Sequence, residues 1–128
     1  MLRIALLAAL ALPLVACLEP TEDYHSVQWT SAASIDNCDE VEMTVTFANR
    51  VEEYDYAYGC NASGGFSWSS DDPPLSVELF AYETWERDCE YLELFCNGTT
   101  TDYFLVGSAK GALDLTSDVT PFVIQPVE

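Results

Sequence analysis

Carboxylates are the side chains of this sequence that could do chemistry, because they are numerous and stand in short clusters. The chain holds 22 Asp and Glu against 4 Lys and Arg, a formal net charge of -18 at pH 7. Hard cations such as Ca²⁺ bind several carboxylate and carbonyl oxygens at once. Weak candidates for such a site are Asp36, Asp39, Glu40, Asp71 and Asp72. The sequence has no EF-hand spacing. We therefore favour a solvated acidic surface with no cofactor, and calcium binding is the alternative.

Aromatic side chains form a second set of candidate binding residues. Tyr54, Tyr56 and Tyr58 follow each other at every second position, which would place three rings on one face of a strand, and Trp68 lies further along. An exposed row of rings can stack on sugars or anchor a protein partner. Such a row more often packs into a core, and that is the favoured interpretation.

Catalytic chemistry has little support in the sequence. His25 is the only histidine and is expected in a solvated tether, which weakens any Ser-His-Asp or Cys-His mechanism. The motifs G-x-S-x-G and H-E-x-x-H and a phosphate loop are missing from the sequence. A glycosidase needs only two carboxylates, but no pair stands out. We expect no enzyme, and a carboxylate-dependent hydrolase is the remaining catalytic alternative.

The charge balance also limits the partners. A chain with so few Lys and Arg cannot neutralise phosphates, so we expect no nucleic-acid partner. Hydrophobic residues make up 49% of the chain, which excludes a disordered acidic tail. A negative field of this size would steer a basic protein partner toward the domain.

The start of the chain predicts an export signal. A short basic start precedes an apolar run from Ile4 to Ala16. As a helix this run would be about 20 Å long, too short for a bilayer core of about 30 Å. It is therefore typical of the hydrophobic region of a signal peptide and not of a membrane-spanning anchor.

The motif Leu14-Val15-Ala16-Cys17 resembles the lipobox of bacterial lipoproteins. The resemblance covers only the targeting segment. It implies removal of residues 1–16 and acylation of Cys17, whose acyl chains would hold the protein in a lipid bilayer without spanning it. The residue after Cys17 is Leu18 and not Asp, which in these lipoproteins favours the outer membrane of a Gram-negative bacterium.

Without Cys17, four cysteines remain, an even number that suits two disulfides in an exported domain. They are Cys38, Cys60, Cys89 and Cys96. Cα atoms of paired cysteines lie within about 7 Å of each other, whereas Cys89 and Cys96 would be about 23 Å apart in a strand and about 10 Å apart in a helix. We therefore disfavour pairing of Cys89 with Cys96. Each is expected to pair with Cys38 or Cys60, in an order left open.

The pattern of residues 26–128 predicts an all-β domain, and residues 17–25 are expected to form a tether that precedes it. Period-two alternation and β-rich composition indicate about eight short strands in a small antiparallel β-sandwich or barrel. The strand-like runs lie near 27–29 and at 41–47, 54–58, 76–82, 91–96, 99–106, 112–116 and 122–127, with a weaker, shorter run at 66–69.

The segment between residues 84 and 98 allows two interpretations. Asn97-Gly98 between two β-rich runs predicts a type I′ hairpin turn that joins 91–96 to 99–106. Acidic and apolar residues also recur at helical spacing here, which would place one helix near 84–96 in an α+β fold. The hairpin is the favoured interpretation.

Together these features predict an outer-membrane lipoprotein with a β-rich domain that binds or scaffolds and does not catalyse. A calcium- or glycan-binding module at the cell surface is the alternative. A carboxylate-dependent hydrolase is the second alternative.

Overall fold

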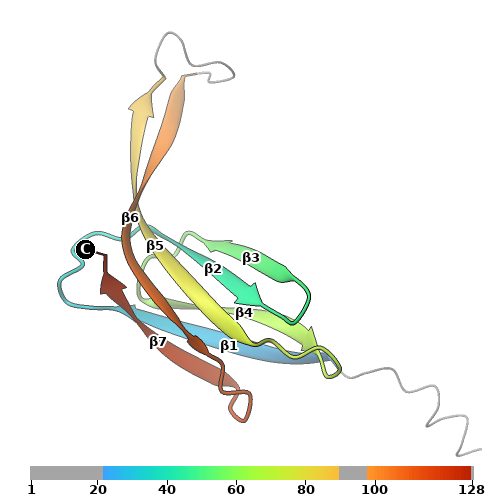
Figure 1. The fold of residues 1–128 in the computed structure, drawn as a ribbon. Helices are drawn as coiled ribbons and strands as arrows, with labels where there is room; N and C mark the ends of the chain where they lie inside the picture. The colour runs from blue at the N-terminus through green and yellow to red at the C-terminus, as the bar shows by residue number, and fades with distance from the viewer. Residues whose placement is uncertain (1–21, 90–97, 128) are drawn as a thin grey trace, which may run out of the picture.

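The computed structural model describes residues 22–89 and 98–127, and these form seven β-strands without a helix (Figure 1). The strands are β1 (Glu22–Ser31), β2 (Glu40–Thr46), β3 (Val51–Tyr56), β4 (Ala62–Ser69), β5 (Ser76–Asp88), β6 (Thr99–Ala112) and β7 (Val119–Pro126). The predicted all-β class is confirmed. In the described ranges no helix is long and apolar enough to span a membrane.

The strands hydrogen-bond in the order β3-β2-β5-β6-β7-β1-β4, a nearly closed, barrel-like sheet. Strands β1 and β7 pair in parallel, and the other neighbours are antiparallel. Strands β6 and β7 share only two register pairs, Gly107–Pro126 and Ser108–Gln125. The sheet turns at this short contact, so that β4, β1 and β7 lie across from β3, β2 and β5 (Figure 1).

The hydrophobic core fills the space between these two layers. In β2, Val41, Met43 and Val45 are fully buried and alternate with partly exposed residues, as the period-two pattern predicts. Trp29 of β1 is also fully buried, and its Nε1–H donates a hydrogen bond of 2.9 Å to the Gly59 carbonyl oxygen. The alternation in β2 therefore fixes which of its side chains face outward, and this matters for the candidate site.

Aromatic rings close the gap between β3 and β4, the two ends of the strand order. The rings of Tyr54 and Phe66 stack with centroids 6.3 Å apart, and those of Tyr56 and Trp29 lie 5.3 Å apart. A Cβ atom at position 64 would overlap the Tyr56 ring, so Gly64 is required for this contact. Side chains thus join the two edge strands.

Cys38 and Cys60 form a disulfide with each other, and Cys89 is disulfide-bonded as well. The prediction that Cys38 and Cys60 pair with Cys89 and Cys96 is therefore wrong. The reason is tertiary: the loop before β2 and the loop before β4 meet, with the paired Cα atoms 5.6 Å apart. Closing this loop, with a sequence separation of 22, stabilises the fold by about 3 kcal/mol in the chain-entropy account. Cys96 lies outside the described residues.

The far halves of β5 and β6 extend beyond the two layers as a two-stranded arm, residues 82–88 and 99–105 (Figure 1). Here Asp88 pairs with Thr99, so the predicted two-residue turn at Asn97-Gly98 is wrong, although Gly98 does have a positive φ of 93°. The connection is longer because residues 99–104 pair with 83–88 and not with 91–96. Residues 84–88 are strand, so the helix alternative is wrong there; residues 90–97 lie outside the described ranges.

Two further expectations differ from the structure. No separate strand covers 112–116, because β6 continues to Ala112 and a turn follows before β7. The described ranges therefore hold seven strands where about eight were expected. Strand β1 begins at Glu22, within the stretch 17–25 that was expected to be a tether.

Candidate functional site

Five carboxylates share the outward side of β3, β2 and β5, and we call this surface the acidic face. Because alternate residues of β2 are buried, Glu40 and Glu42 point away from the core. Glu42 pairs in register with Asp55 of β3, and the neighbouring Thr44 pairs with Glu53 on one side and Glu78 on the other. Antiparallel pairing therefore gathers on one surface the residues Glu40, Glu42, Glu53, Asp55 and Glu78.

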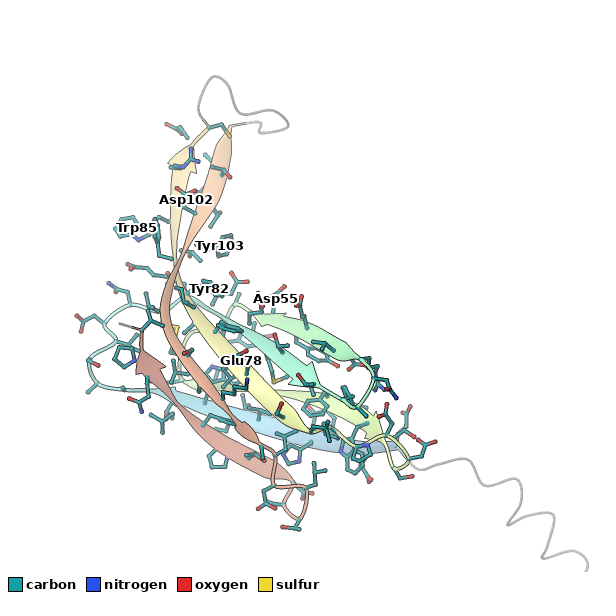
Figure 2. All side chains as sticks on the ribbon, in the orientation of Figure 1. Asp55, Glu78, Tyr82, Trp85, Asp102 and Tyr103 are labelled. Atoms are coloured by element: carbon teal, nitrogen blue, oxygen red, sulfur yellow. A yellow bond between two sulfur atoms is a disulfide. The ribbon has the colours of Figure 1, made fainter. Side chains whose placement is uncertain are left out.

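A concavity of about 310 Å³ lies where the acidic face meets the base of the arm. It is lined by Glu40, Glu42, Asp55, Tyr82 and Tyr103. The two tyrosine rings meet edge to face, with centroids 6.2 Å apart and planes at 88°. Figure 2 shows Asp55, Tyr82 and Tyr103 around this region, with Trp85 on the other side of the arm. The concavity thus combines three carboxylates with a wall of two aromatic rings.

The carboxylates of this concavity repel one another and act on the groups between them. Burial raises the pKa of Glu42, and the nearby carboxylates of Glu53, Asp55 and Glu40 raise it further. Burial also raises the pKa of the Tyr82 hydroxyl, with added contributions from Glu42, Asp55 and Glu40. A cation bound among these groups would relieve the repulsion, so the concavity favours positively charged ligands.

The structure separates most of the carboxylates proposed as calcium ligands. Asp39 accepts hydrogen bonds from the backbone N–H of Thr84 at 2.8 Å and from its hydroxyl at 3.3 Å. Asp72 forms an ion pair with Arg50, and Asp71 accepts a hydrogen bond from Ser69. Asp36 lines a different depression, and Glu40 alone of the five lines the acidic concavity. Within residues 22–89 and 98–127, no group of three or more His, Cys, Asp or Glu could hold a metal ion.

The predicted aromatic row is divided between core and surface. Tyr54, Tyr56 and Trp68 are partly buried and pack against the core, in agreement with the favoured interpretation. Tyr58 is 71% exposed and follows the end of β3. The aromatic residues of the concavity, Tyr82 and Tyr103, were not singled out in the sequence. Only the pairing of β5 with β6 brings them together.

His25 is buried, so its assignment as a solvated tether residue is wrong. It belongs to β1, where His25, Val27 and Trp29 occupy alternate buried positions. Its Nε2 lies 2.7 Å from the Thr120 hydroxyl oxygen of β7, and this oxygen also accepts the Asp114 N–H at 3.0 Å. His25 therefore links β1 to the start of β7 and to the turn before it, away from the acidic concavity.

The contribution of His25 to the stability of the fold should be lost as the pH drops from about 7 to about 5. Burial lowers the pKa of His25 below its ordinary value of 6.5, although Asp114 and Asp118 partly oppose the shift. The unfolded chain therefore binds a proton at a higher pH than the folded chain. The stabilising contribution is complete above pH 6.5 and is lost as the pH falls toward the folded-state pKa.

Urea unfolding at several pH values measures this effect. The chain with His25→Gln should lose less stability over that pH range than the unchanged chain. The raised pKa of Glu42 acts with the opposite sign, but it is common to both proteins and cancels in the comparison. Equal pH slopes for the two proteins would contradict the prediction.

Comparison of the chain with protein-family models, with curated proteins and with solved structures found no match. The assignment of a site therefore rests on the geometry of this chain. A larger depression of about 410 Å³ over β1 and β4 is lined only by uncharged side chains. The acidic concavity is the stronger candidate because charge, aromatic rings and strand register converge there.

Proposed function

We propose that this chain is a non-catalytic binding module that holds a cationic protein segment against the acidic face. The observation that carries the proposal is the concavity formed by Glu40, Glu42 and Asp55 beside the edge-to-face pair of Tyr82 and Tyr103. Carboxylates attract Lys and Arg head groups. Tyrosine rings contact their aliphatic stems and also interact with the cation through the ring face, which contributes about 0.5–2 kcal/mol. This combination suits a basic polypeptide better than a small neutral ligand.

The proposal extends to the cellular setting. We place the module at the bacterial cell envelope, anchored through acylated Cys17 and facing a protein partner. The lipobox-like motif at Leu14-Val15-Ala16-Cys17 supports this placement. After removal of residues 1–16, which include Arg3, the lipid-anchored module would keep three basic residues against 22 acidic ones, a formal charge of -19. It would be repelled by anionic lipid headgroups and would attract basic proteins near the membrane.

The proposed function is tested by binding of a fluorescently labelled oligolysine to the full-length chain, followed by anisotropy. We expect saturable binding that weakens by about tenfold or more as salt is raised from low concentration to well above physiological ionic strength, because salt screens these charges. A labelled peptide of Gly and Ser with the same length serves as the control. Equal affinity for both peptides, or oligolysine binding that salt does not weaken, would refute the proposal.

A further inference from the structure

The β5 strand has an edge in the arm that no other described strand covers. Strand β2 pairs with β5 only as far as Glu40, which lies opposite Tyr82, whereas β5 continues to Asp88. Just beyond this point Asp39 donates its N–H to the Tyr82 carbonyl oxygen, and its carboxylate accepts the Thr84 N–H. Asp39 therefore ends the ladder between β2 and β5 and leaves the rest of this edge open.

Backbone groups for a further strand are present along this edge. Tyr82 and Thr84 direct their hydrogen-bonding groups toward β2, and in a strand every second residue points to the same side. Glu86 therefore directs its N–H and C=O toward the open edge and not toward β6. An extended peptide could pair with β5 here, beyond the point where its pairing with β2 ends. Proteins that bind peptides by strand addition use such an edge.

The two faces of the arm differ in character beside this edge. Glu86 lies on the same face as Tyr82, which lines the acidic concavity, because both occupy even positions of β5. The opposite face carries Trp85 and Phe104, which are 58% and 51% exposed, and the strand register places them diagonally next to each other. Figure 2 shows Trp85 and Tyr103 on opposite sides of the arm.

A second copy of this chain is a poor occupant of the edge. Antiparallel pairing of β5 with itself would bring Glu86 close to its own equivalent, and like charges across strands are destabilising. The formal charge of -18 on each copy adds long-range repulsion. Charge complementarity instead favours a basic peptide.

We propose that the open edge of β5, from Thr84 to Asp88, is a strand-addition site for an extended peptide that alternates basic and apolar side chains. The basic side chains would face Glu86 and the acidic concavity, and the apolar ones would lie beside Trp85 of β5. This inference rests on the proposed function and specifies how the cationic partner is held.

The test uses a capped, labelled octapeptide of alternating Lys and Val, with the full-length chain and two variants. Glu86→Pro removes the N–H that points to the open edge, and proline is tolerated at such edge positions because the ladder with β6 does not use that group. Glu86→Gln removes the same charge but keeps the N–H. We expect Glu86→Pro to bind about tenfold more weakly than Glu86→Gln.

A second measurement does not depend on how the proline variant folds. The same octapeptide with every backbone nitrogen methylated keeps its charge, but its backbone cannot donate hydrogen bonds to β5. It should bind the unchanged chain about tenfold more weakly than the parent peptide. Equal affinities for the two peptides, or for the two variants when both fold, would overturn strand addition. If salt-dependent oligolysine binding persists in that case, the proposed function stands and only this inference fails.

Discussion

Replacing Trp29 with Ala is expected to lower the free energy of unfolding by about 3–5 kcal/mol. Trp29 is fully buried between the two layers, and its ring contacts that of Tyr56 with centroids 5.3 Å apart. Its indole N–H also satisfies the carbonyl oxygen of Gly59, next to the disulfide at Cys60. The substitution would open a cavity and leave that carbonyl without its partner. A domain of this size has about 5–15 kcal/mol of stability in total, so the variant would be close to unfolding.

Urea unfolding followed by circular dichroism measures this loss, because fluorescence would change with the tryptophan content. Trp85→Ala is the matched control, since Trp85 is 58% exposed on the arm. The control should change the free energy of unfolding by about 0.5 kcal/mol or less. Similar losses for both variants would contradict the assignment of Trp29 to the core and of Trp85 to an exposed arm.

The sequence correctly predicted the strands in which apolar and polar residues alternate without a competing helical pattern. The alternation of Val41, Met43 and Val45 with polar residues predicted β2 and its buried side, because period-two alternation is what a half-buried strand requires. The arm was harder to predict. Residues 84–88 have helical spacing as well as β-forming residues, and pairing with β6 decides between the two. His25 was misplaced because the strand was expected to begin only near residue 27, although His25 continues the period-two alternation of Val27 and Trp29.

The chemical character of the candidate site could be predicted from the sequence, but the residues that form it could not. An acidic surface that attracts basic partners follows from composition alone. The residues that gather on it depend on register: Glu42 meets Asp55 across β2 and β3, and Tyr82 meets Tyr103 across β5 and β6. Register over such distances is set by tertiary packing, and a shift by one residue would move each side chain to the other face. The sequence clusters at 36–40 and 71–72 were conspicuous, but proximity in the chain did not make them a site.

Charge reversal on the acidic face is expected to have the largest effect on binding. Changing Glu42→Lys together with Asp55→Lys removes two attractions of about 0.2–1 kcal/mol each and adds repulsions of similar size. The sum of about 2 kcal/mol corresponds to an affinity for oligolysine about thirtyfold lower. Both residues point away from the core, so the fold should persist, and circular dichroism can check that it does.

The matched control changes the same net charge at a distant place. The control carries Glu22→Lys and Asp23→Lys. Both positions lie at the exposed start of β1, in the other layer of the fold. This control reduces the overall charge equally but leaves the concavity intact. It should weaken oligolysine binding by about threefold or less, because charges separated by more than about 10 Å are largely screened at moderate salt.

The measurement that tests the central claim most directly is the ratio of the oligolysine affinities of these two doubly substituted chains, at one moderate salt concentration. If the acidic face is the binding site, the variant at Glu42 and Asp55 will bind about tenfold or more weakly than the variant at Glu22 and Asp23. If the two variants lose the same affinity, binding depends only on the total charge of the chain, and the acidic face is not a site.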